Sequence, residues 1–336
     1  MEIYMKKSRV LVLCTSVLLL LSSCSSWKAG DFLEKGKNDG RFCSQKEIDQ
    51  AIDYLEKFRK KKGIPEFEIL SEEKTELKLI KRDDTWYLDV KVNDLPMRFF
   101  LDTGSGYSGL FYDNVKLFGK NYDDYSATLE GIDKGDMFYY FVRKVEFANV
   151  RCNYMCCPSD LLRNSWGAAG VLGDWELFNS CKILSLDLRN NKIIYNDEIP
   201  DCKPVKFEYC SENGSLVLYV KIGSKEYLAV LDTGWPDYGM SSIDFNESNQ
   251  IVDYDIPMKS GWYKEVNDAS KLVTVPTIEM GEFVLENYAL NRVEEGGSYD
   301  THWNCEIILG ECFFERAKLT FDVENGLCYV QPAVKK

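Results

Sequence analysis

The segment FFLDTGSGYSGL, from Phe99 to Leu110, ends an apolar run in Asp-Thr-Gly, and LAVLDTGWPDYG, from Leu228 to Gly239, repeats this pattern 130 residues later. Turns favour Asp and Gly in general, so a single triplet of this kind carries little information. Two triplets are informative, because each acidic side chain comes where a strand-like apolar run stops. The pair therefore points to an internal repeat.

Further landmarks keep the same order in both halves of the chain. Val90-Lys91-Val92 aligns with Val220-Lys221-Ile222 at the same offset of 130, and Val171-Leu172-Gly173 aligns with Ile308-Leu309-Gly310 at an offset of 137. An ordered series of matches indicates a duplicated structural unit. We therefore predict two homologous domains, residues 67–202 and 203–336.

The composition favours β structure. The chain has 336 residues, of which 45% are hydrophobic and 28% charged, as in ordinary globular proteins. Tyr and Phe are plentiful, and short apolar stretches separated by turn residues dominate after residue 67. We predict an all-β fold with one short helix before it, over residues 44–62.

The repeated unit resembles the aspartic protease clan. Each half is similar to a retropepsin-like lobe, with a strand, Asp-Thr-Gly, a flap hairpin, an apolar-apolar-Gly motif and a closing strand, and two fused lobes resemble the pepsin arrangement. The resemblance covers roughly residues 78–332 and includes the C-terminal segment EIILGECFFERAKLTFDVENGLCYV. It implies two homologous β-barrel-like lobes with the active-site cleft between them.

The resemblance also implies a role for each motif residue. Asp102 and Asp232 would be the catalytic pair, with Gly131 in the flap. Thr103 and Thr233 would hydrogen-bond between the two loops and hold the carboxylates coplanar. The remaining supporting residues would be Gly104, Gly234 and Ser105 in the loops, and Gly173 and Gly310 where a crossing strand passes beneath each loop.

The chemistry of two facing carboxylates agrees with this resemblance. Two carboxylates held close together do not both ionise, so one keeps its proton and the other acts as a base. A water between them loses a proton to one Asp and attacks the scissile carbonyl, which the other Asp hydrogen-bonds. The expected partner is a peptide or protein substrate, and no metal or cofactor is required.

One position departs from the family pattern. Ser105 follows the first triplet, where its hydroxyl is expected to hydrogen-bond Asp102, but Trp235 followed by Pro236 stands in the second. An indole does not supply that bond, and its bulk is expected near the carboxylates. Two functions follow from this: a membrane-anchored aspartic endopeptidase, or a catalytically inactive module of the same fold that binds peptides or envelope components.

Histidine and cysteine usage limits other chemistries. The single histidine, His302, excludes a His-rich metal site, and a Ser-His-Asp or Cys-His mechanism would depend on this one residue. Of the 12 cysteines, ten remain once Cys14 and Cys24 are assigned to the signal and the anchor. Because paired Cys-x-x-Cys knuckles are missing, disulfides or buried thiols are favoured over zinc, with the pairing open.

The N-terminus is typical of a bacterial lipoprotein signal. Basic residues precede the short apolar segment from Val10 to Leu21, which runs into small residues and Cys24. We predict that residues 1–23 are the signal peptide, that Cys24 is lipidated, and that residues 24–66 form a tether and helix. The alternative is an ordinary secretory signal. The lipoprotein interpretation predicts export and attachment to a bacterial membrane, facing the periplasm or the surface.

The net charge excludes one class of partner. Loss of residues 1–23 would remove three basic residues and one acidic residue, which moves the net charge from −13 to −15. Such a surface repels nucleic acid, and the sequence has no clustered basic stripe to reverse this. We expect no nucleic-acid partner.

Overall fold

The computed structural model describes residues 57, 59–82, 85–106, 108–110, 128–130, 136–160, 168–209, 215–235, 238–241, 271–292 and 305–335. This part of the chain is mostly β-sheet with few and short helices, which confirms the predicted dominance of β structure. Residues 59–62 are helical, and the rest of the helix predicted over 44–62 lies outside the described residues. The signal peptide, Cys24, Gly131 and His302 also lie outside them.

The elements of the first half, in chain order, are β1 (Phe67–Ile69), β2 (Thr75–Lys78), β3 (Ile80–Arg82), β4 (Thr85–Val92), β5 (Leu95–Leu101), β6 (Gly109–Leu110), β7 (Thr128–Glu130), β8 (Asp136–Phe147), β9 (Val150–Asp160), β10 (Gly170–Leu172), α5 (Asp174–Phe178), β11 (Ile183–Asp187), η2 (Leu188–Asn190) and β12 (Lys192–Tyr195). Those of the second half are β13 (Val205–Tyr209), β14 (Leu216–Ile222), β15 (Lys225–Leu231), β16 (Gly239–Ser241), β17 (Lys271–Met280), β18 (Phe283–Arg292), β19 (Ile307–Leu309), α6 (Glu311–Phe314), β20 (Ala317–Asp322) and β21 (Leu327–Pro332).

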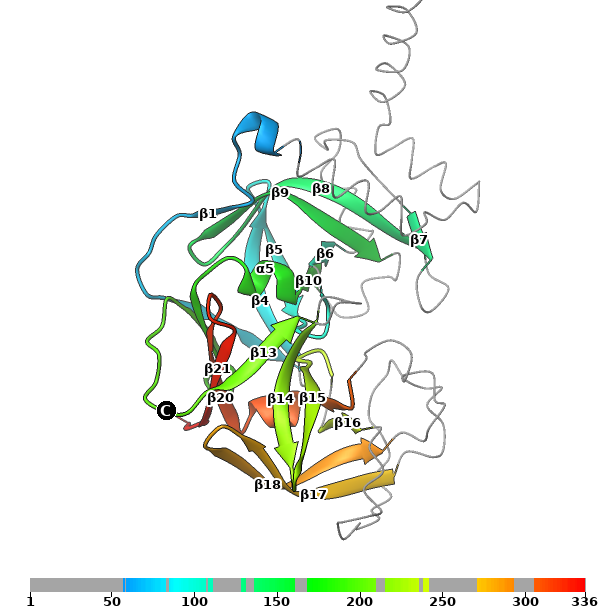
Figure 1. Cartoon of the computed structure of the whole chain (residues 1–336). Coiled ribbons are helices and arrows are strands. Elements are labelled where there is room, and N and C mark those ends of the chain that lie inside the picture. The colour runs from blue at the N-terminus through cyan, green and yellow to red at the C-terminus, as the bar shows by residue number, and fades with distance from the viewer. Residues whose placement is uncertain are drawn as a thin grey trace, which may run out of the picture.

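Six strands of the second half close into a barrel. The pairings run β14–β15–β19–β16–β18–β17, and β17 pairs with β14 to complete the circle. The corresponding strands of the first half follow the same order, with β4, β5, β10 and β6 on one side of β8 and with β9 on the other. Figure 1 shows the β8–β9 hairpin at one end of the molecule and the β17–β18 hairpin at the other.

The repeat in the sequence is therefore a repeat in strand pairing. In each half a short strand runs parallel to the strand that ends in Asp-Thr-Gly, so that Leu172 pairs with Leu101 and Leu309 pairs with Leu231. These pairs reproduce the sequence offsets of 137 and 130. The sequence forms strands here because its apolar residues alternate: in β4, every second residue from Trp86 to Val92 is buried.

A further set of strands joins the halves. β11 pairs antiparallel with β20, and the hydroxyls of Ser185 and Thr320 lie 2.7 Å apart across this junction. Beneath it, the rings of Phe178 and Phe321 pack edge to face with centroids 4.7 Å apart. One hydrophobic core thus extends through both halves.

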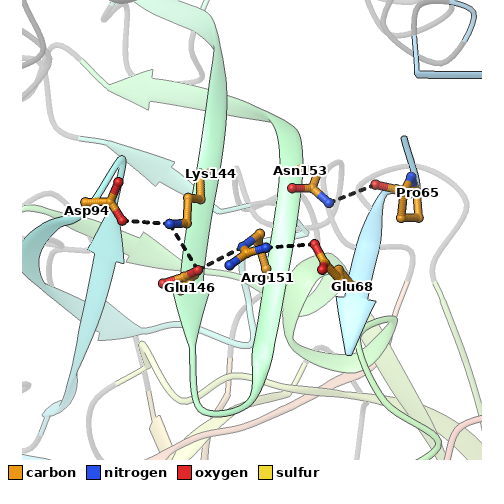
Figure 2. Close-up of polar contacts among 7 residues, drawn as sticks. All are labelled: Pro65, Glu68, Asp94, Lys144, Glu146, Arg151 and Asn153. Carbon is orange, nitrogen blue, oxygen red and sulfur yellow. Dashed lines mark hydrogen bonds and ion pairs between the residues drawn. The ribbon is translucent and has the colours of Figure 1, made fainter. Parts of the chain in front are cut away.

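The N-terminal strand β1 pairs antiparallel with β9, and a ladder of ion pairs lies beside this pairing (Figure 2). Arg151 on β9 contacts Glu68 at 2.9 Å and Glu146 at 2.8 Å, and Lys144 continues the ladder from Glu146 to Asp94. Exposed ion pairs of this kind contribute little stability each. The register of β1 is therefore given by its backbone pairing with β9, in which Glu68 lies opposite Arg151.

Candidate active site

Asp102 and Asp232 occupy equivalent positions directly after β5 and β15. The amide of Asp102 donates to Leu172 O and that of Asp232 donates to Leu309 O, each at 3.0 Å. The acceptors belong to β10 and β19, the short strands that run parallel to β5 and β15, and Gly173 and Gly310 follow directly after them. Each Asp is therefore fixed by the motif that the sequence places beneath its loop.

Two threonines clasp the loops together. Thr103 Oγ1 accepts the amide hydrogen of Thr233 at 3.0 Å and donates to Leu231 O at 2.7 Å. Thr233 Oγ1 accepts from the amide of Thr103 at 3.0 Å and donates to Leu101 O at 2.9 Å. Both side chains are buried, so four hydrogen bonds join the halves where no water competes for them.

The two loop glycines bring the carboxyls face to face. A Cβ atom added to Gly104 would lie 2.4 Å from Cγ of Asp232, and one added to Gly234 would lie 2.7 Å from Cγ of Asp102. The same glycines donate their amides to the Asp of their own loop, at 3.0 Å and 2.9 Å. Glycine is needed here because each carboxyl packs on the backbone of the opposite loop.

Burial and proximity change the acidity of the pair. Burial raises the pKa of Asp102, although amide hydrogen bonds and the hydrogen bond with Asp232 oppose this change. Burial and then the charge of Asp102 raise the pKa of Asp232 well above its usual range. Two carboxyls in this arrangement hold one proton between them over a range of pH in which isolated carboxyls are ionised.

Trp235 takes the same backbone position as Ser105. Its amide donates to Asp232 O at 3.2 Å, as the amide of Ser105 donates to Asp102 O at 3.1 Å. The indole is only 4% exposed and packs into an apolar cluster with Val217, Val230, Met240 and Ile308. The expected bulk beside the carboxylates is thus absorbed by packing and does not project into open space.

Strand alternation places this cluster on the carboxyl side of the sheet, since Val230 and Asp232 are two residues apart. The equivalent cluster in the first half contains Tyr87 and Phe100, which align with Val217 and Val230 at the offset of 130. The first half fills this space with aromatic side chains from its strands, and the second half fills it with Trp235 from its loop. The two sides of the pair are therefore apolar but different in shape.

Two further buried acids follow Gly173, and sequence reasoning missed both. Asp174 opens α5 and is fully buried, while Glu176 is 3% exposed and accepts from the amide and hydroxyl of Ser108 at 2.9 and 2.8 Å. A signal was present in the repeat, because Gly173 and Gly310 are each followed by an acid, Asp174 and Glu311. The repeated apolar-apolar-Gly motif therefore continues for one more residue, which is acidic in both halves.

Because these acids are buried, we predict that the protein is more stable at acidic pH than at neutral pH. Burial raises the pKa of Glu176 to about 7, so between pH 4.5 and 7 the unfolded chain ionises this group while the folded chain keeps its proton. Unfolding free energy therefore falls as pH rises through this window, on the order of 3 kcal/mol for Glu176. Denaturant titrations at pH 4.5 and 7 should show this loss, and Glu176→Gln should reduce it.

Exposed Glu282, changed to Gln, is the matched control and should leave the loss unchanged. Acids with a lowered pKa act in the opposite sense, Asp197 among them: although burial opposes it, hydrogen bonds from Lys74 and Lys318 lower the pKa of this carboxyl. Its stabilising effect is lost only at pH values below the window tested. Equal pH dependence in wild type and Glu176→Gln would contradict the prediction.

The flap and the cysteines, which the sequence also singles out, fall only partly within the described residues. β7 and β8 pair as a hairpin on either side of the predicted flap, but Gly131 itself is outside the described part. Four described cysteines are free thiols, namely Cys152, Cys181, Cys202 and Cys328. Within the described ranges no group of three or more His, Cys, Asp or Glu side chains is placed to hold a metal ion. No helix in this part of the chain is long and apolar enough to cross a membrane.

A comparison of the chain with protein-family models finds no match, and a comparison with curated proteins finds no significant match.

Proposed function

We propose that this chain is an aspartic-type endopeptidase, which hydrolyses peptide bonds with a water activated by Asp102 and Asp232. The observation that supports this most strongly is the facing carboxyl pair, joined by the reciprocal hydrogen bonds of Thr103 and Thr233. A buried acid pair is costly to fold, because desolvation disfavours its charged form. Scaffolding alone gives no reason to keep two such acids face to face.

In the proposed reaction the pair starts with one proton. Burial raises the pKa of both carboxyls, so the proton belongs to the pair, and the steps are written here with it on Asp232. Asp102 removes a proton from the water, the water oxygen bonds to the scissile carbonyl carbon, and Asp232 gives its proton to the carbonyl oxygen. The carbon–nitrogen bond then breaks as the leaving nitrogen takes the proton held by Asp102, while Asp232 takes back a proton from one hydroxyl of the tetrahedral intermediate. This leaves a carboxylic acid and an amine, and it restores the pair with one proton.

The proposal includes two barrel-like lobes and a substrate cleft between them. Each half would be one lobe, and an extended peptide would lie across the carboxyl pair. The apolar clusters around Tyr87 and Phe100 on one side, and around Trp235 on the other, favour apolar side chains next to the cleaved bond. Hairpins such as β7–β8 would cover the peptide.

The proposal also includes attachment to a bacterial membrane through lipid at Cys24. Several acyl chains on one cysteine give stable anchoring, whereas a single chain is marginal. The enzyme would then act on peptides or proteins of the cell envelope, on the periplasmic side or at the surface. Mass spectrometry of the membrane-extracted chain tests this part, since lipidation must add mass at Cys24 and remove residues 1–23.

Peptide cleavage tests the enzymatic proposal. The full chain, extracted in detergent, is incubated with a mixed peptide library between about pH 3 and 7, where a pair sharing one proton is active. We expect cleavage on the acidic side of this range, and we expect a statine-containing peptide inhibitor to block it. The identified cleavage sites would then give the specificity.

The alternative, an inactive module that binds peptides, is favoured by one observation. Trp235 takes the backbone position of Ser105 and buries its indole, so the second half has no hydroxyl at the position that follows its Asp-Thr-Gly triplet. A chain that binds the statine inhibitor, as seen by a higher melting temperature, but cleaves no library peptide would support this alternative. A chain that neither binds nor cleaves would refute the endopeptidase and the peptide-binding module, and would favour a module that binds envelope components.

A further inference from the structure

Asp174 joins the first Asp-Thr-Gly loop to the second half of the chain. Its side chain is fully buried, and Oδ2 accepts the amide hydrogen of Leu216, the first residue of β14, at 2.6 Å. Its own amide donates to Ser105 O at 2.8 Å. One residue therefore contacts the loop of Asp102 through its backbone and the other half through its carboxyl.

The residue before Leu216 closes a second connection to the same loop. Ser215 is buried and donates its hydroxyl to Gly104 O at 2.9 Å. Gly104 in turn donates its amide to Asp102. Asp174 therefore holds the start of β14 at the place where β14 reaches the catalytic loop, and the chain of contacts ends on a carboxyl of the pair.

The surroundings of Asp174 require a neutral acid. Asp102, Asp232, Glu176 and the Tyr209 hydroxyl face it, and no cationic side chain among the described residues pairs with it. Burial, reinforced by the neighbouring acids, raises the pKa of Asp174 well above its usual range. Oδ2 accepts a hydrogen bond and Oδ1 has no hydrogen-bond partner in the described part of the chain, so the proton belongs on Oδ1.

The equivalent residue of the second half works differently. Glu311 opens α6 and contacts the ammonium of Lys81 on β3, which also lies 2.5 Å from Glu315. Both acids therefore reach from one half to the other, but Glu311 does so through an ion pair and Asp174 through a neutral hydrogen bond. The Asp174 contact differs also in that it is linked, through Ser215, to the loop that carries Asp102.

We propose that Asp174 is a positioning residue for the carboxyl pair, which as a neutral acid fixes the loop of Asp102 against the first strand of the second half. The proposal rests on the proposed function, because positioning has a purpose only if the pair carries out the reaction. Its test uses a structural readout, so that it does not depend on cleavage.

The test compares Asp174→Asn with Asp174→Leu in the full chain. Asn keeps an acceptor for the Leu216 amide without a charge, whereas Leu branches at the same atom, is larger than Asp and leaves that amide unpaired. Hydrogen exchange, read by mass spectrometry, is followed in the two loops, residues 102–106 and 232–235. We expect Leu to raise exchange in both loops roughly tenfold or more, and Asn to leave it close to wild type.

General destabilisation is controlled by Leu285→Ala, which removes a buried side chain from β18. This variant should destabilise the chain without opening the two loops selectively. The proposal is overturned if Leu opens only residues 215–217, if Asn opens the loops as much as Leu does, or if the Leu285→Ala variant gives the same loop pattern.

Cleavage of the peptide library by the same variants separates the two proposals. Asn should keep activity at pH 4 within about threefold of wild type and extend it to higher pH, because no charge develops beside the pair. A merely structural role would not move the pH profile. If the loops open as expected while wild type neither cleaves peptides nor binds the statine inhibitor, the positioning role stands and the proposed function fails.

Discussion

Asp102→Asn and Asp232→Asn are each expected to lower the rate of peptide-bond hydrolysis by about 10³-fold or more. The pair works only if one member accepts a proton from water while the other donates one, and an amide does neither. Asn has nearly the shape of Asp, so the amides of Gly104 and Gly234 and the Thr103–Thr233 contacts remain available. The rate should therefore fall without unfolding.

The measurement is kcat/KM for one cleaved peptide from the library at the pH of maximal activity. Melting curves of each variant accompany it, and an unchanged or higher melting temperature is expected, since burying a carboxyl at this position is unfavourable. Exposed Asp201, changed to Asn, is the matched control and should retain wild-type activity. If either Asp102→Asn or Asp232→Asn retained more than a tenth of the wild-type rate, the water would have to be activated by other groups.

The repeat made the centre of the fold predictable from sequence. Asp102 and Asp232 follow strands of the same length and are each held by the backbone of an apolar-apolar-Gly segment, so the offsets of 130 and 137 reappear as strand pairs. Backbone pairing of this kind depends on local pattern and order, which a sequence carries. The chemical roles of the residues remain proposals.

The surroundings of the side chains were harder to predict from sequence, because they depend on contacts between distant segments. From the loop sequence alone, the bulk of Trp235 is expected to crowd Asp232. In the structure its ring occupies room left by Val217 and Val230, where the first half has Tyr87 and Phe100. The exchange of aromatic bulk between strand and loop becomes visible only when the two halves are compared in space.

Asp174 illustrates the same limit. A carboxyl after the glycine of the motif gives no sign in sequence that it will be buried, or that Leu216 will supply its hydrogen bond from 42 residues away. Its partner is a backbone amide, which any residue could supply. The contact becomes visible only in the structure, where β14 begins next to the loop of Asp102.

Gly104→Ala and Gly234→Ala are expected to act across the pair, each disturbing the carboxyl of the opposite half. The added methyl group would lie 2.4 Å from Cγ of Asp232 in the first case and 2.7 Å from Cγ of Asp102 in the second. Carbon atoms do not approach so closely, so the carboxyl or the loop must move. Because displacements of about 1 Å cost on the order of 10²-fold in rate, each variant should lose at least that much activity.

Carboxyl titration by ¹³C NMR of the full chain distinguishes this crossed effect from general damage. In Gly104→Ala the signal of Asp232 should change its titration most, and in Gly234→Ala the signal of Asp102 should do so. Gly223→Ala is the matched control, because its φ of +61° causes backbone strain but no atom lies within 4 Å of the added methyl group. It should reduce stability by roughly 1 kcal/mol and leave both signals as in wild type. If each alanine instead altered the carboxyl of its own loop, the two carboxyls would not pack on opposite backbones, and the basis for a shared proton would be lost.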